Sequence, residues 1–309
     1  MGGFEAHLSR YHADFAIRLE RSELGASARE RLAALARGPD SGAWQRIVEL
    51  LDSDSVHDLW LEFDGDAGGS DLPVPSVFAG PSDSMGGGGA AATEVAQWVR
   101  LIAGEGAPVG ATSTAERLVG SLPPEGSVFQ IGSMLARPDR GLRLLVRGLE
   151  PPAIAAYLEQ IQWPGDRDAV AESAASWHRF TSSLYLSLDA GPRVGPRLGL
   201  ELMFHDSVEV SATARCERLL GALEKRGLCS RPQREALLSW RGVSTRSNTG
   251  DRWPPGLDQG ASLFQGSLQP VLARGLNHVK IVFETDRPTE AKAYFGYQLL
   301  WLRSDRPER

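Results

Sequence analysis

The stretch SSLYLSLDAGPRVGPRLGLELMF, residues 182–204, decides the fold class because it holds two alternating segments and a turn. In the first segment leucines alternate with Tyr185 and Ser187, and in the second they alternate with Glu201 and Met203. A period of two residues is typical of strands with one buried face. The sequence GPRVGP between them is typical of a hairpin turn, and a segment with helical spacing follows. The stretch therefore predicts a strand–strand–helix unit.

The same order recurs along the chain. SVFQIGSML and GLRLLVRGL, joined by ARPDR, precede the helical pattern PPAIAAYLEQIQW. VHDLWLEFD and VPSVFAG precede TEVAQWVRLIAG, and the chain closes with the strand HVKIVFE and the segment 289–302, which we expect to be a helix. No strand is followed by the Gly-rich turn of a dinucleotide-binding fold. Repeated hairpins predict an α/β (α+β) fold with a largely antiparallel sheet.

We interpret residues 1–309 as a single α/β domain. Residues 1–52 are expected to form an N-terminal helical segment, because SARERLAALARG and GAWQRIVELLDS place apolar side chains at helical spacing. Residues 65–91, with a run of four glycines, and residues 242–268 are expected to be flexible loops. The pattern yields about seven strands, which predicts an open sheet or a partly closed barrel.

Each expected strand has one apolar and one polar face. The apolar faces need cover from amphipathic helices, which places the helices on one side of the sheet. The opposite face is too polar for a core, yet it is richer in aromatic side chains than plain solvated surface requires. Its members are Trp60, Glu62, Asp64, Arg143, Tyr185, Glu201, Met203 and Lys280.

Only three of the 33 Lys and Arg residues are lysine, and two of them, Lys280 and Lys292, lie close together in the sequence. Lys280 belongs to the polar face, where it either pairs with Glu201 or Glu62 or faces a ligand. Lys292 is expected on the exposed face of the closing helix.

Composition excludes several classes of function. A formal charge of −6 argues against a non-specific nucleic-acid binder. The apolar runs are far shorter than the roughly 20 residues of a membrane span, and the N-terminus lacks the apolar core of a signal peptide. We therefore expect a cytoplasmic protein in which Cys216 and Cys229 are free thiols.

Motifs for catalysis, metals and cofactors are missing. The run Gly86–Gly89 lacks the ending of a P-loop, and no GxSxG elbow exists. The acidic turn after Trp60 does not keep the register of a calcium loop. We expect no catalytic residue, no metal and no cofactor. The histidines lack partners at ligand spacing: they are His7, His12, His57, His178, His205 and His278.

One resemblance concerns a set of short sequence segments. The set WLEFD, PSVF, GSMLARPDRGLRLLVRGL, LGLEL and NHVKIV…EAKAYFG resembles accessory proteins of ribosomal-peptide natural-product clusters, with the crocagin-type pathway proteins as the nearest comparison. The resemblance runs from about residue 55 to 300. It implies a protein that binds the precursor peptide without catalysing a step.

A second resemblance concerns architecture. Repeated strand–strand–helix units with a polar-aromatic inner face resemble the antiparallel barrel of the aromatic prenyltransferases. This resemblance implies that Arg143 and Lys280 hold a diphosphate while Glu62 or Glu201 orients the acceptor. The chain departs from the family in strand count, about seven where a closed barrel of that kind needs ten, and in its few Lys and Tyr side chains.

The leading hypothesis is a non-catalytic peptide-binding accessory protein in the biosynthesis of a ribosomally synthesised and modified peptide. Its partners would be the precursor peptide and maturation enzymes of the pathway, with no nucleic acid and no membrane. The alternative is an aromatic or peptide prenyltransferase that uses an isoprenoid diphosphate in a barrel lumen, and a third is a homodimer formed through the polar face. The peptide would bind either on the polar face or at an exposed sheet edge that accepts strand addition. The expected peptide-binding residues are Trp60, Glu62, Arg143, Tyr185, Glu201 and Lys280.

Overall fold

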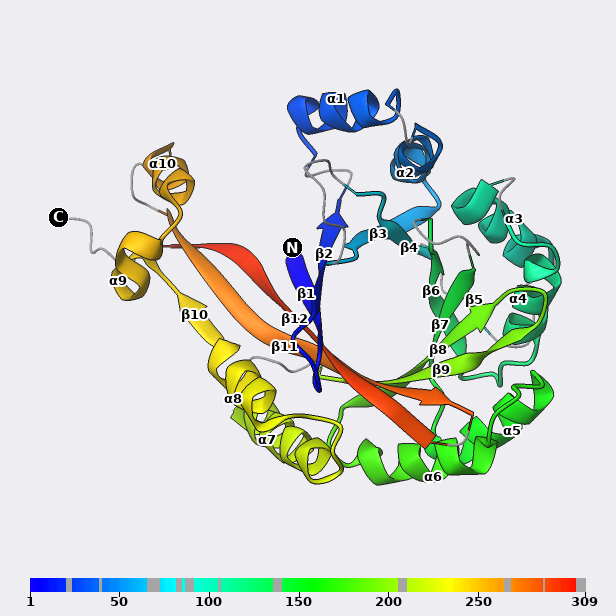
Figure 1. Ribbon diagram of the computed structural model, residues 1–309. Helices are drawn as coiled ribbons and strands as arrows, with labels where there is room; N and C mark the ends of the chain where they lie inside the picture. The colour runs from blue at the N-terminus through cyan, green and yellow to red at the C-terminus, as the bar shows by residue number, and fades with distance from the viewer. Residues whose placement is uncertain are drawn as a thin grey trace.

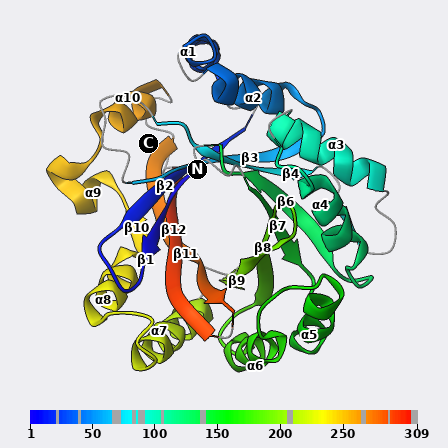
Figure 2. The ribbon, with the colours of Figure 1, turned by 45° about the vertical axis from the view of Figure 1, so that its right-hand side comes forward.

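The computed structural model shows an antiparallel β-barrel inside a layer of helices (Figures 1 and 2). It describes residues 1–20, 24–38, 41–65, 73–81, 85–86, 92–104, 107–135, 141–204, 210–263, 268–285 and 287–303.

Ten strands form the closed ring, in the order β11-β12-β1-β2-β3-β4-β6-β7-β8-β9, and the ring closes because β9 also pairs with β11. Two short strands, β5 (Met85–Gly86) and β10 (Gly242–Ser244), pair with β6 and β11. The ring strands are β1 (Gly2–His7), β2 (Ala13–Leu19), β3 (Val56–Phe63), β4 (Ser76–Pro81), β6 (Ser127–Ser133), β7 (Leu142–Arg147), β8 (Ser183–Ala190), β9 (Val194–Met203), β11 (Leu268–Glu284) and β12 (Arg287–Arg303).

The helices cover only the outer face of the barrel, as Figure 2 shows around the ring. Leu186, Leu200 and Ile281 point outward from β8, β9 and β11 and are buried in the core between barrel and helices. The predicted fold class, with an antiparallel sheet and helices on one face, is confirmed. The covering helices are α1 (Ala26–Leu35), α2 (Ser41–Asp52), α3 (Ala92–Ala103), α4 (Ala111–Gly120), α5 (Pro151–Gln160), α6 (Arg167–His178), α7 (Val210–Lys225) and α8 (Arg231–Trp240).

The N-terminal segment departs from the prediction of helix throughout residues 1–52. The helices α1 and α2 lie where the sequence placed helices, but β1 and β2 precede them. These two strands line the lumen with charged and histidine side chains. In β2 the apolar residues Phe15, Ile17 and Leu19 alternate with smaller or polar residues, a strand pattern that the helical interpretation overlooked.

The prediction of a helix at residues 289–302 is wrong, because this segment lies within the long strand β12. Small Ala293 points to the core while its neighbours Lys292 and Tyr294 point into the lumen. The alternation of inward polar and outward small side chains is that of a strand, although the apolar residues of the segment also fit a helical spacing. Lys292 is therefore a lumen residue and not an exposed helix lysine.

Both expected loops contain regular structure. Within 242–268, the described residues form β10, α9 (Arg246–Thr249), the 3-10 turn η2 (Gly250–Arg252) and α10 (Pro255–Leu263). Within 65–91, β4 and β5 are strands, while residues 66–72, 82–84 and 87–91, with most of the glycine run, lie outside the described residues. Among the described helices, none has both the length and the apolar character needed to cross a bilayer.

Candidate active site in the barrel lumen

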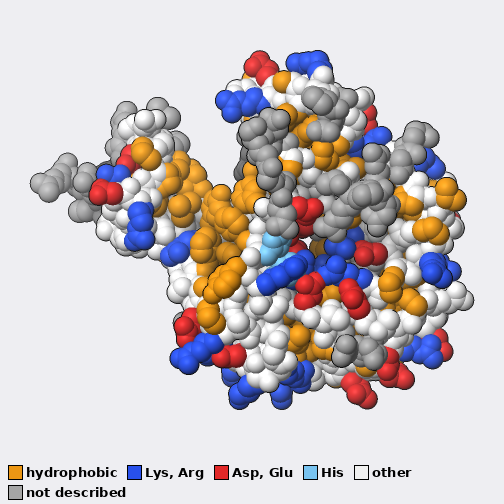
Figure 3. Space-filling model, in the orientation of Figure 1, with side chains coloured by type: hydrophobic (Ala, Val, Ile, Leu, Met, Phe, Trp, Pro, Cys, Tyr) orange, Lys and Arg blue, Asp and Glu red, His pale blue; other side chains and the backbone are white. Residues whose placement is uncertain are grey.

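The residues expected on the polar face lie on the inner face of the barrel, except for Asp64, which follows the end of β3. Lys280 and Tyr185 each lie directly opposite Glu201 in the strand register, so the three side chains share one face. Closure of the ring turns this face into the wall of a lumen, which leaves it unavailable as a dimer surface. Acidic, basic and histidine side chains gather around the hollow at the centre of one face of the molecule (Figure 3).

The lumen has a charged compartment at one end. Its wall includes Glu62, Arg143, Ser187, Lys280 and Lys292, around a space of about 60 Å³. Except for Glu62, the carboxylates around this compartment pair with its cations, so most of its charges are compensated.

Among the described residues, four ion pairs of Lys or Arg with carboxylates make up this network. Arg143 Nε lies 2.7 Å from Asp189 Oδ1, and Lys280 Nζ lies 3.2 Å from Glu201 Oε1. Lys280 also donates to Ser187 Oγ at 3.0 Å. The two remaining pairs are Lys292 with Glu5 and Arg197 with Glu290.

An aromatic compartment adjoins the charged one and has a volume of about 290 Å³. Glu62, Arg143, Lys280 and Tyr294 line both spaces, which places the charged groups at the boundary. Four of its lining side chains, those of Trp60, Phe78, Phe129 and Leu145, belong to an apolar cluster separate from the main core. Met203 also lines the space.

Two predicted residues shape the aromatic compartment. Trp60 donates its indole N–H to Asp58 Oδ2 at 2.9 Å, which fixes the ring against the wall. The ring of Tyr185 lies 4.8 Å from that of Phe129, centroid to centroid. The structure thus brings all six predicted residues to one lumen, with Trp60 and Tyr185 on its aromatic side.

Glu62 is the group best suited to exchange a proton near neutral pH. Burial, and then the charge of Glu5, raise its pKa to about 7, although Arg143 and Lys280 act in the opposite direction. No hydrogen bond or ion pair links its carboxyl group to another described residue. A carboxyl group with this pKa can accept or donate a proton during catalysis.

Glu5 and Tyr294 keep their ordinary charge states in the lumen, the first as a carboxylate and the second as a neutral phenol. Burial acts to raise the pKa of Glu5, but Lys292 and Lys280 outweigh it and lower that pKa to about 2. Burial also raises the pKa of Tyr294 well above its usual range, and the carboxylate of Glu5 adds to this. Tyr294 therefore remains a neutral phenol that donates its hydrogen bond to Glu5.

Sequence reasoning missed part of the charged compartment. Glu5, Lys292 and Tyr294 lie on β1 and β12, the two strands that were interpreted as helical. The alternation in EAH and in KAY is the signal that could have identified them, since every second side chain there is polar or aromatic. Asp64 follows β3, whereas His205 and Asp66 lie outside the described residues.

Comparisons with known proteins show a fold but no family. No family profile matches the chain, and no curated protein matches it. Among solved structures, it is similar to 6-dimethylallyltryptophan synthase from Micromonospora olivasterospora, crystallised in complex with DMASPP and Trp. The TM-score is 0.50 at 14% identity, over 95% of this chain and 80% of that one. The chain therefore shares the antiparallel ten-stranded barrel of a prenyltransferase, and the crocagin-type resemblance stays a prediction.

Proposed function

We propose that the lumen is the active site of a prenyl transfer, in which an isoprenoid diphosphate alkylates an aromatic acceptor. One observation carries this proposal: cations gather at one end of a closed lumen whose adjoining space is aromatic. An isoprenoid diphosphate has the same polarity, with an anionic head and an apolar tail. The fold that the chain shares with a dimethylallyltryptophan synthase supports this reading by analogy.

The head would lie against Arg143, Lys280 and Lys292, with its tail beside Trp60 and Phe129. Charged hydrogen bonds from guanidinium and ammonium groups suit phosphate oxygens. As the bond between the prenyl carbon and the diphosphate oxygen breaks, the diphosphate leaves with the electron pair. The developing allyl cation is stabilised by the faces of the surrounding rings.

The acceptor ring then forms the new carbon–carbon bond. Its electrons attack the allyl cation, and the ring carbon loses its proton to restore aromaticity. Glu62 lines both compartments and in its ionised form can take that proton. We therefore assign Glu62 the role of general base, with Arg143 and Lys280 as the diphosphate-binding residues.

A second candidate function, non-catalytic peptide binding, is favoured by the ion pairing of the cations. A diphosphate has to compete with Asp189 and Glu201 for Arg143 and Lys280, so its electrostatic gain is reduced. An aromatic side chain of a peptide needs no such exchange to enter the aromatic compartment. Among the described residues around the charged compartment, the cations Arg143, Arg197, Lys280 and Lys292 face the acidic groups Glu5, Glu62, Asp189, Glu201 and Glu290.

A strand edge gives this second function a place to hold the peptide backbone. The register of β1 with β12 ends at Tyr297, so β12 continues past it to Arg303. Leu299 and Leu302 in this extension are 38% and 50% exposed. An extended peptide could add to this edge by backbone hydrogen bonding.

Titration calorimetry separates the two functions. Tag-free protein is titrated with dimethylallyl diphosphate and, separately, with tryptophan-containing precursor peptides. Prenyl transfer predicts micromolar diphosphate binding that is lost in Lys280→Met and kept in Lys225→Met, a matched change of an exposed lysine on α7. Prenyl transfer also predicts that mass spectrometry detects a prenylated product. Failure of the diphosphate to bind, together with peptide binding that is lost in Trp60→Ala, overturns the enzyme proposal in favour of the peptide binder.

A further inference from the structure

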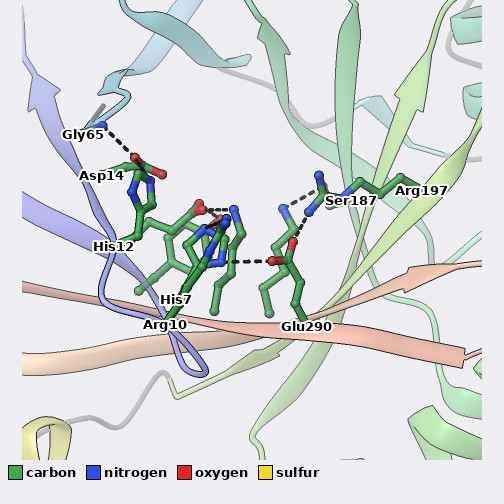
Figure 4. Close-up of polar contacts among 12 residues, drawn as sticks. His7, Arg10, His12, Asp14, Gly65, Ser187, Arg197 and Glu290 are labelled. Atoms are coloured by element: carbon green, nitrogen blue, oxygen red, sulfur yellow. Dashed lines mark hydrogen bonds and ion pairs between the residues drawn. The ribbon is translucent and has the colours of Figure 1, made fainter. Parts of the chain in front are cut away.

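The turn between β1 and β2 brings two histidines and an aspartate together at the charged end of the lumen (Figure 4). His7, His12 and Asp14 each offer one ligand atom, and these atoms all lie within 4.8 Å of one another. None of the three has a role in the proposed prenyl transfer. The cluster is a separate feature of the fold.

The hairpin geometry causes this clustering. The backbone N–H of His7 donates to the carbonyl of His12 at 3.1 Å, and Asp14 lies directly opposite Glu5. Opposed residues and those two positions away share one face of a sheet, so all three side chains point inward. His7 and Asp14 are only 4% and 6% exposed, which distinguishes them from the acidic clusters common on protein surfaces.

The contacts around the cluster orient its donor atoms. The Arg10 guanidinium can only donate to His7 Nε2, which places the imidazole proton on Nδ1 and the lone pair on Nε2. Glu290 Oε2 lies 3.0 Å from Nδ1 without hydrogen-bond geometry, and a carboxylate beside this ring nitrogen is common among metal-binding histidines. Asp14 Oδ1 accepts from the backbone N–H of Gly65 at 2.8 Å and lies 2.9 Å from His12 Nε2.

Gly65 is required for this arrangement. A Cβ atom there would lie 2.2 Å from the backbone oxygen of Ala13, so only glycine lets the end of β3 approach β2 this closely. The close approach delivers the N–H that holds the Asp14 carboxylate. Gly65 and His12 thus hold the Asp14 carboxylate from two sides.

An ordinary hydrogen-bond network is the competing interpretation of these contacts. Arg10 Nη2 lies 3.1 Å from His7 Nε2, at the atom that would bind a metal. The Arg10 side chain is exposed in the turn and can swing into solvent. The two interpretations therefore differ in what happens when Arg10 is removed.

We propose that His7, His12 and Asp14 form a binding site for a divalent transition metal ion of the zinc class. Two imidazoles and one carboxylate are donors that Zn²⁺ accepts, and three protein ligands leave a coordination position open toward the lumen. In the ligand-free network Arg10 covers His7, so metal binding displaces its guanidinium group. The proposal stands independently of prenyl transfer.

Metal titration of the tag-free, chelator-treated protein tests the site. Calorimetry with Zn²⁺ is expected to show one equivalent bound, and Co²⁺ is expected to show visible ligand-field bands of low coordination number. His12→Ala and Asp14→Asn should each weaken binding about tenfold or more. Arg10→Ala should strengthen binding, because it removes both a competing donor and a repelling charge.

Matched variants decide between the interpretations. His178→Ala changes a histidine on α6 that is not part of the cluster, and it should leave binding unchanged. Circular dichroism checks that the half-buried His12→Ala variant keeps its fold. If Zn²⁺ binds His12→Ala as it binds the unchanged chain, or if Arg10→Ala fails to increase the affinity, the cluster is only a hydrogen-bond network and the proposal is wrong.

Discussion

Lys292 on β12 donates a hydrogen bond to Glu5 on β1, across 287 positions of the chain. The contact lies inside the barrel at the junction of its first and last strands, where His7 is also registered against Lys292. It links closure of the ring to the charge balance of the lumen, because Lys292 helps to keep Glu5 ionised.

Removing one partner of this pair should destabilise the barrel strongly. Lys292→Met leaves the Glu5 carboxylate buried beside fewer positive charges, and such changes cost about 3–5 kcal/mol of unfolding free energy. Urea denaturation measures the loss. The double variant Lys292→Met/Glu5→Gln should recover much of it, because no unpaired charge remains. Lys225→Met on α7 is the control, and a single variant as stable as that control would contradict the prediction.

Glu62 should make stability depend on pH. Its folded-state pKa of about 7 lies above its ordinary value of 4.5, so the folded chain holds a proton that the unfolded chain releases. The stability contributed by this group is therefore greatest below the unfolded pKa and is lost as pH rises through about 7. Glu62→Gln removes the ionisation.

Thermal unfolding at two pH values checks this sign. The melting temperature of Glu62→Gln relative to the unchanged chain should be higher at pH 8.5 than at pH 5. Glu172→Gln, an exposed change on α6, should show no such difference between the two pH values. If the melting temperature of Glu62→Gln differs from that of the unchanged chain by the same amount at both pH values, the carboxyl group does not titrate in this range.

Trp60 should dominate binding in the aromatic compartment. Its indole lines the space and is fixed by Asp58, so Trp60→Ala removes a wall of the cavity and a stacking surface. Loss of a central aromatic side chain commonly costs about 2 kcal/mol or more of binding free energy, or roughly thirtyfold in Kd. Calorimetry with the aromatic ligand measures the change. Trp60→Phe should retain part of the affinity, and equal loss in both variants would rule out a stacking role.

A methyl group at Gly199 should displace Lys280 without removing its charge. A Cβ atom there would lie 2.3 Å from Lys280 Cε and 3.1 Å from Ser187 Cβ. Gly199→Ala should therefore weaken diphosphate binding about tenfold while the fold is retained, because the ammonium group loses its position. Gly221→Ala on α7, where a Cβ meets nothing within 4 Å, is the matched control. Unchanged binding in Gly199→Ala would exclude a positional role for Lys280.

The two cysteines should be inert toward thiol reagents in the folded protein. Cys216 and Cys229 are free and buried, and burial raises the pKa of each thiol to about 11. Little thiolate is present at neutral pH, and thiolate is the reactive form. Both should react with Ellman's reagent in guanidinium chloride and only slowly before unfolding. Rapid reaction of the native protein would indicate an opening of α7 or of the α7–α8 connection.

Alternation along the hairpins determined the outer and inner faces of β3, β7, β8, β9 and the middle of β11. For that reason Trp60, Glu62, Arg143, Tyr185, Glu201 and Lys280 were recognisable as one polar set from the sequence alone. A period of two is a local property of the backbone, and it survives in any tertiary arrangement.

Only the tertiary structure decided that the sheet closes. The strand β12 has a polar inner face and small residues outside, and its apolar residues also fit a helical spacing, so its local pattern does not separate strand from helix. The pairing of β12 with β1 joins segments nearly the whole chain apart, and its free energy cannot be read from any single window of sequence. The meeting of Lys292 with Glu5, and of His7 with Glu290, follows from that closure alone.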